Sequence, residues 1–171
     1  MTLTMARVDQ KLIHGQVIAA WVPHLGIEEI IVVDEDVLSD ALTQSILTAA
    51  VPPQVRQTCF AAPADLPKIL QSRPHANRRL LLLFGDLSAV KAALDQGLRL
   101  ENLNLGNQAC QPNAECRKLS SCFFASSSDL AILDSLARAG LNLFFQSVPG
   151  DRPIPFCPAD LTPSGGRPRT A

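Results

Sequence analysis

A histidine with basic residues close to it in sequence lies near the start of the chain. Arg7 and Lys11 precede His14, and Gly15 follows it. A neutral imidazole can attack phosphorus, and basic side chains can balance the negative charge of the phosphoryl group that the ring receives. Together these residues describe an anion site, and two interpretations of His14 stay open at this point: a structural residue of a strand-to-helix turn, or the nucleophile of a phosphoryl-transfer site in which Arg7 and Lys11 bind phosphate.

The segments on either side of His14 suit this chemistry. Residues 3–8 form an apolar run that predicts a buried strand, and residues 15–25 predict a helix, so His14 falls at their junction. Backbone N–H groups in the first turn of a helix lack intrahelical partners, and the positive helix end favours anions and a neutral imidazole. We therefore expect the N–H groups of Gly15, Gln16 and Val17 to bind phosphate oxygens.

Asp9 lies between the predicted strand and His14, and its role has two interpretations. It could orient the loop by accepting hydrogen bonds from backbone N–H groups or from a guanidinium group. It could equally be an ordinary turn aspartate. The sequence leaves both interpretations open.

Strand-like and helix-like segments alternate along the rest of the chain. This pattern predicts a single α/β domain with a doubly wound, mostly parallel sheet of about seven strands and helices on both faces. In such sheets, ligands bind beyond the carboxyl ends of the strands, where His14 falls. The helix expected at 39–51 carries Leu42, Ile46 and Leu47 on one face. The expected strands are 3–8, 29–33, 55–61, 80–84, 100–105, 119–124 and 141–148, and the expected helices are 15–25, 39–51, 64–71, 87–96 and 130–139.

Composition narrows the class of protein. The chain has 171 residues, of which 47% are hydrophobic and 18% charged, and its net charge is −1. These values favour a globular protein and give no sign of nucleic-acid or anionic-membrane binding. No apolar run approaches the ~20 residues that span a bilayer, and no secretory signal is recognisable. The five cysteines lack metal-site spacing, so we expect reduced thiols in a cytoplasmic protein.

Other chemistry-bearing residues have simpler interpretations. The carboxylates of Asp34, Glu35 and Asp36 could bind Mg²⁺ with Asp9, as in response-regulator receivers. A receiver also needs a lysine near its fifth strand, and residues 104–107 contain none, so helix capping and a solvated loop are favoured. His24 and His75 are expected at the surface, and Trp21 in the core or at a partner contact. No nucleotide-binding glycine motif occurs, and we expect neither a metal nor a cofactor.

The segment Arg7–Val17 resembles the enzyme IIB subunit of the mannose/fructose/sorbose family of the bacterial phosphoenolpyruvate-dependent sugar phosphotransferase system. That family carries Arg-Ile/Val-Asp followed closely by Leu-Ile-His-Gly-Gln-Val at the end of its first strand. Weaker similarity at residues 82–84, 104–106 and 141–148 extends the resemblance over roughly residues 3–160. The resemblance implies a IIB-type phosphocarrier domain at 1–160, and we expect residues 161–171 to form a disordered tail.

The resemblance also implies an activity and partners. His14 would accept phosphate from a phosphorylated IIA protein or domain, through Nδ1 in the family, and pass it to a sugar held by membrane IIC and IID subunits. The chain would then be a phosphotransferase that is cytoplasmic and peripherally associated with the membrane permease. Family members often pair with themselves, so a homodimer is an open alternative. No nucleic-acid partner is implied.

Three positions depart from the family pattern. Lys11 replaces the usual arginine, Gln10 stands where an acid is common, and Asn107 follows Gly106 where the family tends to have two glycines. Lysine keeps the charge but lacks the planar, two-pronged contact with phosphate. We expect Gly106 and Asn107 to line the site. These departures leave a second hypothesis open, a non-catalytic regulatory or ligand-binding module derived from the same fold.

Overall fold

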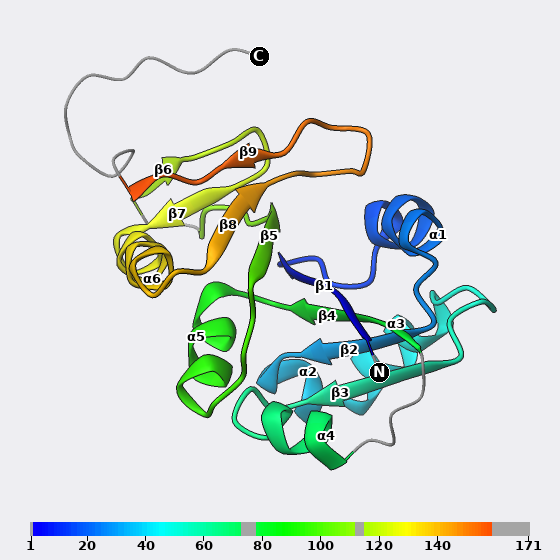
Figure 1. Cartoon of the computed structure of the whole chain (residues 1–171). Helices are drawn as coiled ribbons and strands as arrows, with labels where there is room; N and C mark the ends of the chain where they lie inside the picture. The colour runs from blue at the N-terminus through cyan, green and yellow to red at the C-terminus, as the bar shows by residue number, and fades with distance from the viewer. Residues whose placement is uncertain (1, 73–77, 112–114, 159–171) are drawn as a thin grey trace.

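The protein folds around a mostly parallel sheet of seven strands (Figure 1). The computed structural model describes residues 2–72, 78–111 and 115–158. The strand order is β3-β2-β4-β1-β5-β8-β9, and β9 is antiparallel to β8. A separate antiparallel pair, β6 and β7, lies outside this sheet. The strands are β1 Thr2–Asp9, β2 Glu29–Val33, β3 Gln57–Ala61, β4 Arg79–Phe84, β5 Asn102–Asn107, β6 Cys116–Lys118, β7 Phe124–Ser126, β8 Asn142–Phe145 and β9 Ile154–Pro155.

Helices cover both faces of the sheet. The π-helix η1 (Val17–Trp21), α1 (Val22–Leu25), α2 (Glu35–Ser39) and α3 (Ala41–Ala49) share one apolar cluster with one face. The helices α4 (Leu66–Ser72), α5 (Leu87–Asp95) and α6 (Ser127–Arg138) pack against the other face. The predicted doubly wound α/β architecture is therefore confirmed.

The central strand β4 shows why this sequence forms two cores. Leu80, Leu82 and Phe84 join the cluster beneath α4, α5 and α6, whereas Leu81 and Leu83 join the cluster beneath α1, α2 and α3. Successive side chains of a strand point to opposite faces, so an unbroken apolar run suits a strand that is buried on both sides. Burial of the run at 80–84 thus places β4 in the middle of the sheet.

Polar residues begin several helices. The Asp34 carboxylate accepts the Val37 N–H at 2.9 Å and caps α2, so the helix-capping interpretation of Asp34 is confirmed. Asp40 caps α3 in the same way. The helix expected at 39–51 is therefore α3, and α2 is an additional short helix before it. Ser126 and Asp129 form a capping box at α6.

Two expected strands were wrong in detail, and one expected helix face is mostly exposed. On α3, Leu42 and Ile46 are exposed at 71% and 61%, and only Leu47 of the expected face packs against the core. Residues 119–122 of the strand expected at 119–124 form a turn instead, in which the Leu119 and Ser120 N–H groups both donate to the Phe123 carbonyl. Phe123 pairs with Gln108 in an isolated bridge, and Phe124 begins β7. The last expected strand, 141–148, is limited to β8, and β9 follows it after a loop.

The expectation of five reduced cysteines was also wrong. Cys110 and Cys116 form a disulfide, with their Cα atoms 5.8 Å apart, a separation that such a bond spans. Among the described residues the other three cysteines are outside disulfides, and no cluster of potential metal ligands occurs. Within the same ranges, no helix has the length and apolar character needed to cross a bilayer. His75 and residues 161–171 lie outside the described residues.

Candidate functional site

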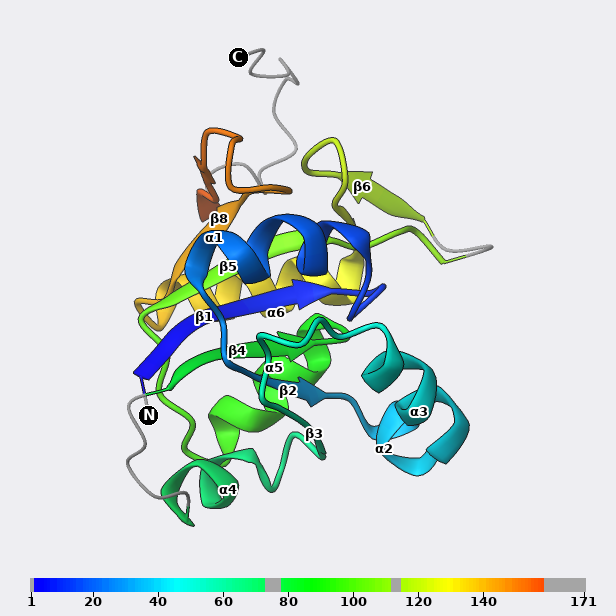
Figure 2. The same ribbon diagram turned by 90° about the vertical axis from the view of Figure 1, so that its right-hand side faces the viewer.

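His14 lies just beyond the carboxyl end of β1, which is flanked in the sheet by β4 and β5. Its backbone carbonyl accepts the Ile18 N–H at 2.9 Å, and its Nδ1 accepts the Gln16 N–H at 3.1 Å. The imidazole therefore caps the first turn of the helix that continues through η1 and α1. The strand-to-helix junction expected from the sequence is present (Figure 2).

Asp9 contacts the imidazole directly. The carboxylate is fully buried, and its Oδ1 lies 3.0 Å from His14 Nε2. The same oxygen accepts the Lys11 N–H at 3.2 Å, which fixes the turn between strand and helix. Since Nδ1 accepts an amide N–H, the ring proton belongs on Nε2, where it is donated to Asp9. This arrangement leaves the Nδ1 lone pair directed to the helix N-terminus.

Arg7 is buried beneath this pair and uses all its hydrogen-bonding capacity. Its Nε and Nη2 donate to Asp9 Oδ2 at 3.1 and 2.8 Å, and Nη1 donates to Asn104 Oδ1. The backbone carbonyls of Gln146 and Ser147 accept the remaining bonds at 2.9 and 3.2 Å. A guanidinium group has five N–H donors, so direct phosphate binding by Arg7 would require the loss of one of these bonds.

Gly106 and Asn104 complete the surroundings of Arg7 from the neighbouring strand β5. A Cβ atom on Gly106 would collide with the Arg7 guanidinium group, so only glycine leaves room for it. Asn104 is fully buried and also donates to the Gln146 carbonyl at 3.2 Å. The roles of Asn104 and Gln146 were not predicted from the sequence. A buried asparagine inside an apolar strand was the available signal, since buried polar groups need partners.

Asn107 lies opposite Asp9 in the parallel pairing of β1 with β5. Its carbonyl accepts the Gln10 N–H at 2.9 Å, and its buried Nδ2 has no hydrogen-bond partner among the described residues. The Gln10 side chain in turn accepts the Ala109 N–H at 2.9 Å. Gln10 thus joins the His14 turn to the end of β5.

Burial lowers the pKa of His14 below its ordinary value. The Asp9 carboxylate opposes this shift, whereas the positive charges of Arg7 and Lys11 add to it. The side chain is 18% exposed, so one edge of the ring still faces solvent. A lowered pKa keeps the imidazole neutral near pH 7, which is the nucleophilic form.

The other predicted phosphate-binding residues surround His14 differently. Lys11, Gly15 and Gln16 are exposed, whereas the Val17 side chain is buried. The positive charge of Lys11 contributes to lowering the His14 pKa, although less than burial does. The backbone N–H groups of residues 15–17 belong to the first helical turn, where amides lack intrahelical partners and suit an anion, and that of Gln16 donates to His14 Nδ1.

Apolar anchors hold the turn in place on both sides of the imidazole. Leu12 and Ile13 are buried with Val17 in the cluster beneath α1, α2 and α3. Leu12 has φ of 53°, a left-handed conformation that L-residues seldom adopt, and its N–H donates to the Asp9 carbonyl at 2.8 Å. Trp21 is buried with its ring 5.5 Å from the Arg7 guanidinium carbon, and its Nε1 donates to the Ser147 carbonyl at 2.9 Å. His24 is exposed, as expected.

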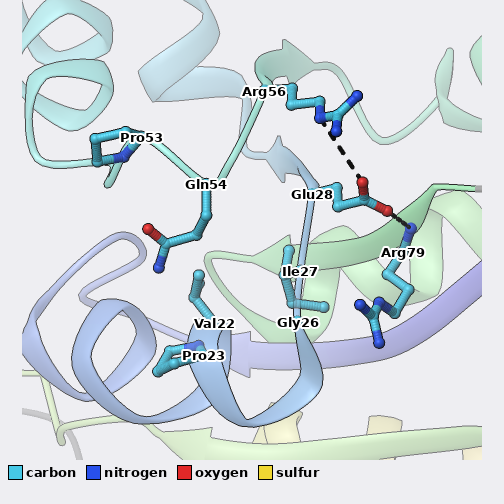
Figure 3. A pocket seen from close by; sticks show the side chains of 9 residues that line it. All are labelled: Val22, Pro23, Gly26, Ile27, Glu28, Pro53, Gln54, Arg56 and Arg79. Carbon is cyan, nitrogen blue, oxygen red and sulfur yellow. Dashed lines mark hydrogen bonds and ion pairs between the residues drawn. The ribbon is translucent and has the colours of Figure 1, made fainter.

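A pocket of about 460 Å³ lies at the opposite edge of the sheet (Figure 3). It is formed near the amino ends of β2, β3 and β4. Glu28 in this pocket pairs with Arg56 at 3.7 Å and accepts the Arg79 backbone N–H at 3.3 Å. None of the predicted site residues lines it, so the pocket and the His14 site are separate. The lining residues are Val22, Pro23, Gly26, Ile27, Glu28, Pro53, Gln54, Arg56 and Arg79.

Comparison with known proteins places the chain in a family. The sequence profile described as "PTS system sorbose subfamily IIB component" matches residues 3–160. The chain is 27% identical to the sorbose-specific EIIB component of Lacticaseibacillus casei over 88% of this chain and 90% of that protein. It is 26% identical to the mannose-specific EIIAB component of Escherichia coli K12 over 88% of this chain and 46% of that protein, so it spans about half the length of this relative.

Solved structures agree with the sequence comparison. The crystal structure of manxB from Thermoanaerobacter tengcongensis matches with a TM-score of 0.79 and 26% identity, covering 90% of this chain and 92% of that one. The IIBSor domain of the sorbose permease from Klebsiella pneumoniae matches with the same TM-score and 25% identity, covering 90% and 93%. The chain therefore belongs to the IIB components of the mannose/fructose/sorbose family of the sugar phosphotransferase system.

Proposed function

We propose that this chain is a phosphohistidine carrier that accepts a phosphoryl group on His14 from a phosphorylated IIA protein or domain. It passes this group to a sugar bound by membrane IIC and IID subunits during sugar uptake. The observation that supports this role best is the pairing of Asp9 with His14 Nε2. That contact leaves Nδ1 as the nucleophilic nitrogen at a helix N-terminus. In this role the chain works in the cytoplasm beside the membrane permease.

The first transfer is an in-line displacement at phosphorus. A bond forms between His14 Nδ1 and phosphorus while the bond between phosphorus and the donor nitrogen breaks. The donor imidazole keeps the released electron pair. As Nδ1 becomes bonded to phosphorus, the Gln16 N–H turns from the ring nitrogen to a phosphoryl oxygen. The amides of Gly15 and Val17 bind the other oxygens.

Two basic residues stabilise the phosphorylated state, one exposed and one buried. Lys11 is exposed beside the ring and offsets the phosphoryl charge as a point cation. Arg7 acts from beneath, because its bonds to Asp9 hold the carboxylate against Nε2–H. Asp9 is thus a positioning residue that fixes the tautomer of His14. Gly106 keeps Arg7 in place, and Asn107 lies at the border of the site.

The second transfer reverses the role of His14. A sugar hydroxyl attacks phosphorus, the bond to Nδ1 breaks, and the ring returns to its neutral form with the electron pair on Nδ1. The hydroxyl proton passes to a base on the membrane partner that holds the sugar.

A phosphorylation assay tests the proposal. The chain is incubated with phosphoenolpyruvate, the general carrier proteins of the system and its matching IIA protein. We expect one acid-labile phosphate on His14 and release of that phosphate to sugar when membranes with IIC and IID are added. Phosphate uptake by the His14→Ala variant at the wild-type level would contradict the assignment.

A second candidate function rests on the three departures from the family pattern. Lys11, Gln10 and Asn107 stand where relatives differ, and Gln10 is occupied in a structural bond to the loop after β5. A regulatory module of the same fold would accept phosphate without passing it on, or would accept none. Sugar-dependent dephosphorylation in the presence of the membrane subunits would exclude this alternative.

A further inference from the structure

Large apolar side chains are exposed on α2 and α3. Among the described residues, Leu38, Leu42 and Ile46 are 39%, 71% and 61% exposed. Leu42 and Ile46 are four residues apart on α3 and therefore share one helix face. Together with the exposed acids Glu35 and Asp36 on α2, these three residues make up what we call the α2–α3 surface. Grouped exposed apolar residues are a common mark of an interaction site.

The α2–α3 surface lies at the same edge of the sheet as His14. Asp34 begins α2 directly after β2 ends, and β1 and β2 point to this edge (Figure 2). On the inner side of the same helices, Val37 and Leu47 pack in the cluster that contains Leu12 and Ile13. The outer surface and the turn that carries His14 thus rest on one apolar cluster at the same edge of the sheet. A protein that binds the surface can therefore also reach the imidazole.

The surface is acidic as well as apolar. Residues 34–40 include four carboxylates, at positions 34, 35, 36 and 40, and residues 12–55 contain no lysine or arginine. Asp34 and Asp40 are used as helix caps. Glu35 and Asp36 are exposed, and neither forms an ion pair within the described part of the chain. Their charge is available to a basic partner.

We propose that the α2–α3 surface docks on the cytoplasmic face of the membrane subunits that hold the sugar. This inference rests on the proposed function. Cytoplasmic loops of membrane proteins are enriched in lysine and arginine, which complements the acids beside the apolar residues. Apolar anchors at the centre and charges around them are the usual composition of a protein interface. Leu42 and Ile46 are the anchors, and Glu35 and Asp36 guide the approach.

Three double variants test which of the two transfer steps depends on the α2–α3 surface. Leu42→Gln/Ile46→Gln removes the anchors, and Glu35→Gln/Asp36→Asn removes the charges without touching a helix-capping side chain. Leu3→Gln/Ile154→Gln is the matched control, because these residues are 38% and 43% exposed on other elements. Thermal unfolding and gel filtration confirm that each variant is folded and report its oligomeric state.

Each variant is assayed in two reactions. The first is phosphorylation of His14 by the soluble IIA protein, and the second is transfer from the phosphorylated chain to sugar in membrane vesicles containing IIC and IID. We expect the first rate to be unchanged in all variants. Removal of the anchors is expected to lower kcat/KM of the second reaction about tenfold, equivalent to about 1.4 kcal/mol. Removal of the charges should weaken its dependence on salt, and the control should match the wild type.

The other outcomes overturn the inference in distinct ways. A loss confined to the first reaction would assign the surface to the donor protein instead. Conversion of a dimer to a monomer by the anchor variant, with both rates preserved, would assign it to a second copy of the chain. Wild-type rates in both reactions without such a change would show that nothing in this system docks there. If the wild-type chain itself is never phosphorylated, the proposed function fails rather than the docking surface alone.

Discussion

Asp9→Asn is the substitution that best distinguishes a role of Asp9 in positioning His14 from a role of its negative charge alone. Asp9 Oδ2 accepts two bonds from Arg7, and Oδ1 faces both His14 Nε2 at 3.0 Å and the Lys11 N–H at 3.2 Å. The asparagine side chain has a single acceptor oxygen, which can face either Arg7 or the His14 side but not both. If that oxygen faces Arg7, the amide NH₂ donates to Nε2 and forces the ring proton onto Nδ1, which blocks the nucleophile.

Asp9→Asn should change two measurable quantities, the free energy of unfolding and the rate of His14 phosphorylation. Arg7 and Asp9 are both fully buried, and breaking a buried ion pair costs about 3 to 5 kcal/mol of unfolding free energy. Because asparagine keeps the shape and can accept one bond, we expect about 3 kcal/mol. The wrong tautomer should lower the rate of His14 phosphorylation by about 10² to 10⁴.

Three measurements test this prediction. Urea unfolding gives the change in stability, and conditions are chosen in which the variant is fully folded. Phosphorylation reactions with the IIA donor, quenched at successive times, give the rate of His14 phosphorylation. Nitrogen NMR of the imidazole shows which nitrogen carries the proton. Asp95→Asn on α5 is the matched control, since Asp95 is an exposed carboxylate paired with Lys91. A folded Asp9→Asn variant that is phosphorylated at the wild-type rate would refute the positioning role.

Three further predictions follow from the same contacts. Lys11→Arg should preserve or lengthen the half-life of phosphorylated His14 and Lys11→Ala should shorten it, and equal half-lives in an acid-quench assay would exclude a role in phosphate retention. Gly106→Ala should lower the unfolding free energy by about 1 to 3 kcal/mol, because its Cβ displaces the Arg7 guanidinium group, and an unchanged urea midpoint would contradict that packing. The midpoint of the pH dependence of His14 phosphorylation should lie below about pH 6.5, because burial lowers the folded pKa from its ordinary value, and a midpoint above that pH would contradict the effect of burial.

The same pKa shift has a consequence for stability. The unfolded chain binds the His14 proton at higher pH than the folded chain does, so the unfolded state holds more protons in that window. The contribution of neutral His14 to stability is therefore fully present above about pH 6.5 and is lost as the pH falls through the folded pKa. Comparison of the wild type with His14→Gln by urea unfolding across this range isolates the effect.

The fold could be predicted from the sequence because its strongest signals are local. The apolar run at 80–84 could only suit a strand buried on both faces, and alternation of strands with helices favours parallel pairing. The exposure of Leu42 and Ile46 could not be predicted, because helical periodicity shows which residues share a face and not which face is covered. The edge strand β9 escaped notice because its two residues include a proline.

The candidate site could be predicted in part. The position of His14 follows from the junction of an apolar run with a helix, which neighbouring residues reveal. The burial of Arg7 could not be predicted, because its partners Asn104, Gln146 and Ser147 come from β5 and the segment after β8. Only the strand order, with β5 between β1 and β8, brings these groups together. The Cys110–Cys116 disulfide likewise depends on a distance of 5.8 Å between the two Cα atoms, which cysteine spacing does not encode.

The most direct test of the account is to identify the phosphorylated atom. Phosphorus and nitrogen NMR of the phosphorylated chain locates the phosphoryl group on a residue and on a ring nitrogen. The account predicts phosphorus on Nδ1 of His14, with the ring proton on Nε2 beside Asp9. Phosphorus on Nε2, or on any residue other than His14, would contradict it.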